Sequence, residues 1–181
     1  MARWLARWLA RYIGERLFES LLNFTTNGTS MIASRPVFTL TLTVPHIEDL
    51  GATPLGHRRI ATVTGGSFDG DRLRGTVVSP PSGDWLLLRS DGVMCLDVRL
   101  TLKTDDGALI YMSYKGMRHG PADVIDRLNK GEEVDPSTYY MRASPVFETS
   151  SAKHAWLNRA VFVAIGRRVA AGPIYEVHEV L

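Results

Sequence analysis

Charged side chains that could move protons alternate with apolar residues near the middle of the chain. In the segment MCLDVRLTL, residues 94–102, Asp97 and Arg99 share one face of an extended strand, while Leu96 and its even-numbered neighbours share the other. A carboxylate next to a guanidinium stays ionised. Asp97 could therefore act as a general base or as half of a structural ion pair.

A related combination, an aromatic ring and a hydrogen-bonding group on one strand face, recurs in later segments. The pairs are Tyr111 and Ser113, Tyr140 and Arg142, and Trp156 and Asn158. Apolar walls with a few placed donors and acceptors are the composition of a small-molecule pocket. A single Tyr or Trp more often completes a core with one satisfied polar tip, so the prediction depends on the recurrence.

Other kinds of site find little support. The five His residues lack metal-ligand spacing, and neither a nucleophile elbow nor a phosphate-binding loop occurs, so we expect no metal and no cofactor. The single cysteine, Cys95, excludes an intramolecular disulfide and a cysteine-based zinc site. The 21 Lys and Arg against 19 Asp and Glu give a net charge of +2, which argues against nucleic acid as a partner.

Catalysis would then have to be acid–base chemistry, helped by an arginine that stabilises developing negative charge. The candidates for proton transfer are Asp97, Tyr111, Tyr140, Glu148 and His119. Such chemistry fits isomerisation, cyclisation, lactone opening or elimination of water.

The elements that position these residues are mostly strands. Period-two patterns between turn residues predict strands over 37–44, 59–64, 73–79, 85–89, 93–103, 108–115, 138–149, 156–166 and 174–180. Residues 121–130, PADVIDRLNK, predict one helix. Hairpin-length links favour a mainly β domain closed into an antiparallel barrel, because closure removes exposed edges; a two-sheet sandwich is the alternative.

The sequence period leaves two placements open for the polar strand faces. Either the leucine face of residues 94–102 fills the core and Asp97 and Arg99 meet solvent, or the leucine face is covered from outside and the polar face lines the lumen. The recurrence of polar and aromatic pairs favours the lumen, and we adopt that placement.

The first 22 residues have a helical period instead. Their apolar residues form one stripe, and four Arg against two Glu supply the whole charge excess of the chain. We expect an amphipathic helical arm and linker over 1–30 and a barrel domain over 31–181. The helix could pack on the body or a partner subunit, lie on a membrane surface, or be a targeting or added segment. We expect a cytoplasmic protein, with membrane association through residues 1–22 as the alternative.

Seven blocks of the chain resemble, in order, the uncharacterised family known as domain of unknown function 3237. They are GDW (83–85), RSDG (89–92), LDVR (96–99), TDDGALIY (104–111), YYMR (139–142), PVFET (145–149) and WLN (156–158). The resemblance covers about residues 35–181. Two departures, Ser113 to Gly116 after the Tyr111 strand and His154 before the last block, could alter the pocket.

The resemblance implies a closed β-barrel of lipocalin or streptavidin type, often oligomeric, in proteins of aromatic-compound breakdown and secondary metabolism. It marks as signature positions Trp85, Asp97, Arg99, Tyr111, Tyr140, Arg142, Glu148, Trp156 and Asn158. We therefore predict a homo-oligomer.

The combined prediction is a cofactor-independent isomerase, cyclase or lyase that acts on a small aromatic or polyketide-like oxygenated metabolite in the lumen. Asp97 is the candidate base, and Tyr111 and Tyr140 donate or orient protons. Arg99 and Arg142 stabilise negative charge. The expected substrate-binding residues are Trp85, Glu148, Trp156 and Asn158. The alternatives are a non-catalytic carrier or sensor barrel that binds a small molecule, and a structural oligomerisation module.

Overall fold

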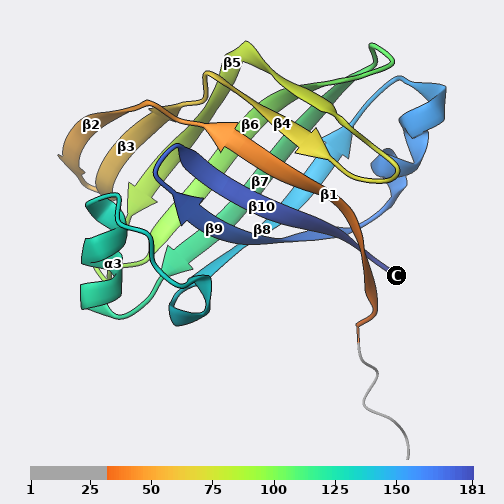
Figure 1. The fold of residues 1–181 in the computed structure, drawn as a ribbon. Coiled ribbons are helices and arrows are strands. Elements are labelled where there is room, and N and C mark those ends of the chain that lie inside the picture. Colours follow the sequence, from red (N-terminus) through yellow and green to blue (C-terminus); the bar gives the residue numbers. More distant parts are fainter. Residues whose placement is uncertain (1–31) are drawn as a thin grey trace, which may run out of the picture. The chain divides into compact units, whose positions relative to one another are not determined.

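The computed structural model describes residues 32–181, which form an antiparallel sheet closed on itself (Figure 1). Its strands are β1 (Ser34–Thr43), β2 (His46–Thr53), β3 (Gly56–Thr62), β4 (Gly65–Asp69), β5 (Gly75–Leu88), β6 (Met94–Thr104), β7 (Leu109–His119), β8 (Tyr140–Glu148), β9 (Phe162–Val169) and β10 (Gly172–Val180). The remaining elements are α3 (Ala122–Asn129) and two 3-10 helices, η1 (Pro136–Thr138) and η2 (Ala152–Arg159).

The strands follow one another around the barrel in chain order. β1 and β2 act as one bent strand, and β3 and β4 act as a second one that lies between it and β5. The last strand, β10, pairs back onto β1. Counted this way the barrel has eight antiparallel strands. The predicted closed barrel is confirmed, and the sandwich is wrong for this chain.

The interior of the barrel is filled by the more apolar face of each strand. On β6, Leu96, Val98, Leu100 and Leu102 are all buried, whereas Arg99 between them is exposed. The lumen of an eight-stranded barrel is just wide enough for side chains to fill. Burying four large aliphatic side chains on this strand is therefore favoured over burying the Asp and Arg of its other face.

Four phenylalanines pack together inside the half of the barrel away from α3. Phe38 contacts Phe68 and Phe147 with ring centroids 5.5 and 6.0 Å apart, and Phe147 meets Phe162 edge to face at 4.8 Å. This aromatic cluster closes that half of the lumen. The empty space lies at the opposite end, where Met94 and Arg118 form the last pair of β6 and β7.

Some predicted strand bounds were wrong. β5 is one strand through the proline-rich PPSGD segment, because the Ser82 hydroxyl donates to the Val78 carbonyl at 2.8 Å and accepts from the Thr101 amide at 3.3 Å, bridging the bulge. β2 and β4 were not predicted. Residues 152–159, expected in part to be strand, form η2, whereas the predicted helix 121–130 is confirmed as α3.

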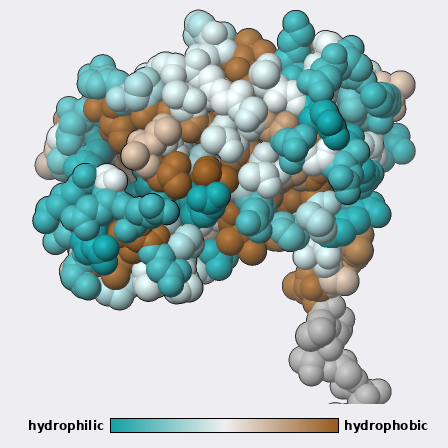
Figure 2. All heavy atoms as spheres, in the orientation of Figure 1, coloured by the Kyte–Doolittle hydropathy of each residue, from teal (hydrophilic) through white to brown (hydrophobic). Residues whose placement is uncertain are grey.

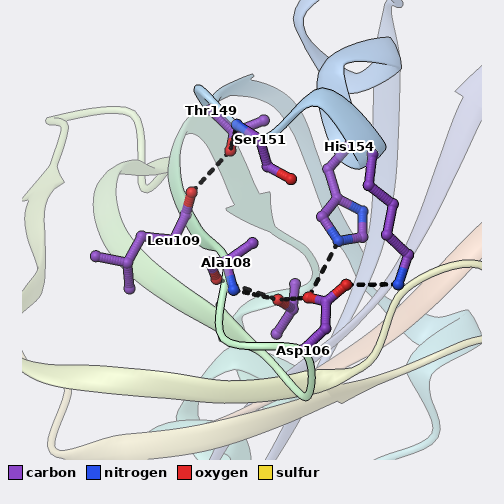
Figure 3. Close-up of polar contacts among 8 residues, drawn as sticks. Asp106, Ala108, Leu109, Thr149, Ser151 and His154 are labelled. Atoms are coloured by element: carbon purple, nitrogen blue, oxygen red, sulfur yellow. Dashed lines mark hydrogen bonds and ion pairs between the residues drawn. The ribbon is translucent and has the colours of Figure 1, made fainter.

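The 3-10 helix η2 is tied to the turn between β6 and β7 by the carboxylate of Asp106 (Figure 3). This carboxylate accepts hydrogen bonds from Lys153 Nζ at 2.5 Å, from buried His154 Nε2 at 3.4 Å, and from the Thr104 hydroxyl. Hydrogen bonds from Lys153 and Thr104 hold the pKa of Asp106 below its ordinary value. The ionised carboxylate therefore joins η2 to the barrel end.

We expect Asp106→Asn to lower the thermal unfolding temperature at pH 7. A carboxylate whose pKa is depressed in the folded state contributes stability above its unfolded pKa of about 3.9 and loses that contribution as the pH falls further. Unfolding curves at pH 7 and pH 3 measure this difference, which should shrink at pH 3. An equal difference at both pH values would show that the charge of Asp106 is not what stabilises this end.

The predicted helical arm and its boundary at residue 30 lie outside the described residues. Among residues 32–181, the structure contains no helix with the length and apolar character needed to span a bilayer.

Candidate functional site

A cavity of about 150 Å³ opens inside the barrel at the α3 end. A void of about this size holds a molecule the size of benzene. Apolar walls come from several strands, and the polar side chains around it are Arg59, Asp84, Tyr114, Arg118, Asn129, Arg168 and Tyr175. Leu128 and Asn129, at the end of α3, close one side. Apolar walls with few polar groups are the composition of a small-molecule site.

Asp84 on β5 is the one carboxylate among the residues that line this cavity. It lies between Ala61 and Val98 in the sheet, both of them buried interior residues. Its Oδ1 accepts a hydrogen bond from the backbone N–H of Asp97 at 3.0 Å. Burial, helped by the nearby charge of Asp97, raises the pKa of Asp84 to about 7, against the opposing effects of that hydrogen bond and of Arg118. Asp84 can therefore both accept and donate a proton near neutral pH.

Two tyrosines face the cavity from β7 and β10. The rings of Tyr114 and Tyr175 meet edge to face with centroids 5.2 Å apart, and both side chains are almost fully buried. Burial raises the pKa of both phenols, so both are neutral hydrogen-bond donors. The Tyr114 hydroxyl lies near that of Tyr175, but within the described part of the chain it makes no hydrogen bond of normal geometry. A buried hydroxyl without a partner is costly, and a bound ligand would satisfy it.

A glycine makes room for Tyr175. A Cβ atom on Gly166 of β9 would lie 2.6 Å from Tyr175 Cε1 and 2.8 Å from Met141 Cγ. The absence of a side chain at Gly166 therefore fixes where the Tyr175 ring packs against the cavity wall.

Two arginines reach the cavity from β7 and β9. Arg118 Nη2 donates to Asn129 Oδ1 of α3 at 3.1 Å, while its buried Nε has no partner among residues 32–181. Burial lowers the pKa of Arg118, and repulsion from Arg168 lowers it further. Burial likewise lowers the pKa of Arg168. The two guanidinium groups therefore act on each other across the same region of the cavity.

A third arginine, Arg59 on β3, is held by a partner on the adjacent β2 strand. Its Nε lies 3.2 Å from Asp49 Oδ2, and the other carboxylate oxygen of Asp49 lies 2.5 Å from His57 Nε2. Asp49 thus neutralises Arg59 locally.

The residues predicted for catalysis lie on the outside of the barrel, so their expected position in the lumen was wrong. Asp97 and Arg99 form an ion pair of 3.2 Å on the outer face of β6. Tyr111 and Tyr140 are 38% and 44% exposed, and Arg142 on β8 also points outward beside Tyr140. The physical reason is that the leucine face of β6 fills the lumen, which leaves the face with Asp97 and Arg99 on the outside.

The predicted substrate-binding residues likewise lie away from the cavity, and of these Trp156 is partly buried against the core. Trp85 is 38% exposed beside Arg99, and Glu148 is exposed opposite Tyr111 on β7. Trp156 stacks under Arg72 with 3.7 Å from guanidinium carbon to ring centroid. Asn158 exchanges hydrogen bonds of 2.9 Å with the backbone of Thr149, which it holds in place. The functional roles assigned to this outer set stay predictions, as does the homo-oligomer.

The outer surface is not uniformly polar. On the face drawn in Figure 2, hydrophobic residues lie in patches between hydrophilic ones. Val146, Val163 and Ile165 are among the exposed apolar residues of β8 and β9. Aromatic and aliphatic residues on one strand face were therefore a poor guide to the interior of this barrel.

A different signal pointed to the cavity residues. Tyr114 and Arg118 continue the interior face that Ile110 and Met112 begin on β7, and Arg168 continues that of Phe162 and Ala164 on β9. Following each apolar face to its polar end would have identified them. Within residues 32–181 no group of three His, Cys, Asp or Glu side chains is placed to hold a metal ion.

Proteins of known sequence and structure resemble this chain over its barrel. A protein of Rhodopseudomonas palustris named UPF0311 protein RPA1785 is 33% identical over 153 residues, 84% of this chain and 99% of the relative. The crystal structure described as that conserved protein of unknown function matches with a TM-score of 0.81, covering 84% of this chain and all of the other.

Two further crystal structures match. A "beta-barrel like protein" from Acinetobacter baumannii AYE is 36% identical with a TM-score of 0.73, covering 86% of this chain and 100% of that one. A structure described as "an enzyme from Penicillium herquei" is 19% identical with a TM-score of 0.65, covering 86% and 98%, and shares the fold. The family model described as "Protein of unknown function (DUF3237)" matches residues 32–180. The chain therefore belongs to this family, as the resemblance of its seven sequence blocks predicted.

Proposed function

We propose that this protein is a cofactor-independent enzyme that performs acid–base chemistry on a small oxygenated, aromatic or polyketide-like molecule inside the barrel. The observation that carries the proposal is Asp84, a largely buried carboxylate on the wall of the cavity, with a pKa of about 7. Titratable groups shifted toward neutrality by burial cluster at catalytic sites. This carboxylate replaces Asp97 as our candidate base.

The cavity residues suggest a division of roles. Asp84 removes a proton from carbon or oxygen of the substrate and returns it at another position, which is the balance of an isomerisation or cyclisation. Tyr114, with its hydroxyl unpartnered in the described residues, donates a hydrogen bond to the oxygen where negative charge develops. The apolar walls exclude water and strengthen both interactions. The fold shared with a protein described as an enzyme is consistent with catalysis.

A non-catalytic carrier is the second candidate. It is favoured by the position of Asp97, Tyr111 and Tyr140 outside the cavity, since the residues with the family's signature pattern then take no part in proton transfer. Both functions use the same cavity, and turnover separates them.

Tyr114→Phe tests the proposed enzyme. Small hydroxylated and keto-aromatic molecules are first screened for binding by thermal shift and then for conversion by mass spectrometry. We expect Tyr114→Phe to lower kcat/KM by about 10²-fold, the effect of one oxyanion donor, with little change in stability because no protein hydrogen bond is lost.

The matched control is Thr39→Val, which removes a hydroxyl from the exposed face of β1 and should leave kcat/KM unchanged. The wild-type kcat/KM should also rise with pH through an apparent pKa near 7 if Asp84 acts as the base. Molecules that bind without being converted, with equal affinity in both variants, would favour the carrier.

A further inference from the structure

We propose that the ligand of the barrel cavity carries an anionic oxygen, either a carboxylate or a phenolate or enolate, that Arg118 and Arg168 bind together. The inference rests on the proposed function for the location of the site. It adds the substrate class: a compact, single-ring organic anion.

The charges that line the cavity do not balance. Three guanidinium groups and one carboxylate, Asp84, contribute to its wall. Arg59 is neutralised by Asp49 at 3.2 Å. In residues 32–181 neither Arg118 nor Arg168 lies within ion-pairing distance of a carboxylate, although eleven other Lys, Arg or His side chains do. Both side chains are partly buried, and charges withdrawn from water in proteins are normally paired.

Asp84 is a poor counter-ion for the two arginines. Desolvation dominates its titration, so its pKa of about 7 leaves it substantially protonated at neutral pH. Burial lowers the pKa of Arg118, and the nearby charge of Arg168 lowers it further, so two like charges repel each other in this region. An anion between them would remove this repulsion and gain charge-assisted hydrogen bonds.

The hydrogen-bonding state of Arg118 agrees with this. Asn129 holds its Nη2 at 3.1 Å and so fixes the plane of the guanidinium, while the buried Nε is left without an acceptor in the described chain. The unpartnered hydroxyl of Tyr114 faces the same cavity. Fixed, unsatisfied donors of this kind are complementary to an oxyanion and not to a further donor.

The size of the site limits the rest of the ligand. About 150 Å³ of space accommodates one six-membered ring. Leu86, Leu96 and Met141 supply apolar walls for that ring. The cavity therefore fits a ring with one anionic substituent better than an extended chain or a polyanion.

Matched probes of one shape test the charge preference. The first pair is benzoate and benzamide, which differ mainly in charge. The second pair is 4-nitrophenol, ionised to the phenolate at pH 8, and neutral nitrobenzene. Binding of each probe to the full chain is measured by isothermal titration calorimetry. We expect benzoate or the phenolate to bind at least about tenfold more tightly than its neutral partner, equivalent to about 1.4 kcal/mol. The pair with the larger ratio of anion affinity to neutral affinity identifies whether the site prefers a carboxylate or a phenolate.

Variants then assign the preference to the two arginines. Arg118→Met and Arg168→Met should each weaken anion binding about tenfold and neutral binding less than threefold, and Arg118→Lys should restore part of the loss. Arg74→Met, an exposed arginine paired with Asp69, is the matched control and should change neither. Circular dichroism confirms that each variant is folded, and if the Met variants unfold, the Lys variant and the wild-type ratios decide.

Failure of this inference differs from failure of the proposed function. Equal binding of charged and neutral probes, no binding of any probe, or anion binding unchanged in both Met variants overturns the anion site. Conversion of a neutral substrate that depends on Tyr114 would then leave the enzyme intact. Selective anion binding without turnover of any bound anion would support the anion site and contradict the enzyme.

Discussion

Asp84→Asn is expected to remove catalysis while making the protein more stable at pH 8. The amide keeps the shape of the carboxylate and can still accept the backbone hydrogen bond from Asp97, but it cannot accept a proton. Loss of a general base costs about 10²–10⁴-fold in kcat. If replacing a functional residue stabilises the fold, the native residue is kept for activity although it lowers stability.

The sign of the stability change follows from the raised pKa. The folded protein keeps a proton on Asp84 up to a pKa of about 7, whereas the unfolded chain releases it near pH 3.9. Wild-type stability therefore falls as the pH rises from about 4 to 7 and is level above that. The Asn variant lacks this loss, so its advantage should grow over the same window to about 2–4 kcal/mol, or an unfolding temperature about 5–10 °C higher at pH 8.

Thermal unfolding at pH 4, 6 and 8 measures this advantage, and turnover is assayed in parallel. The control is Asp69→Asn, an exposed carboxylate beside Arg74 that should show neither effect. An Asn variant that is less stable than the wild type at pH 8 would identify Asp84 as an ionised structural partner and contradict its proposed role.

Phe147→Ala is expected to destabilise the barrel by about 3–5 kcal/mol, the usual cost of removing a buried phenylalanine. Phe147 is 3% exposed and contacts both Phe38 and Phe162 in the aromatic cluster. Its loss would leave a void in the closed half of the lumen. We expect the unfolding temperature to fall by about 10 °C.

The neighbouring residue offers a matched control. Val146→Ala removes an apolar side chain from the exposed face of the same strand and should shift the unfolding temperature by no more than about 2 °C. Calorimetry of both variants compares the two faces of β8 directly. A larger loss for Val146 than for Phe147 would show that the outer face is the one buried in solution, by another copy of the chain.

Much of the fold could be predicted from the sequence, because its local patterns are strong. The alternation in residues 94–102 predicts β6, and the Asp-Gly and short polar turns predict hairpins. Residues 121–130 predict α3. The sequence-based prediction failed where tertiary contacts override local signals. In β5, Ser82 replaces the missing ladder hydrogen bond. The 3-10 helix η2 is held by Asp106, which lies in a turn 48 positions before His154.

The site itself was decided by the tertiary structure. A period of two divides each strand into two faces but does not say which face closes around the lumen. The sequence predicted antiparallel strands with one apolar face each that close into a barrel of this family. Closure then put leucines inside and Asp97 and Arg99 outside, since burying apolar area is favourable and burying unpaired charge is costly.

The cavity residues come from strands far apart in the chain. Asp84, Tyr114 and Arg118, Arg168 and Tyr175 lie on β5, β7, β9 and β10, and no local motif links them. Only ring closure, with β10 paired to β1 and β5 to β6, places them around one space. Their chemistry follows from that shared burial, which raises the pKa of Asp84 and leaves the Tyr114 hydroxyl and the Nε of Arg118 without partners in the described chain.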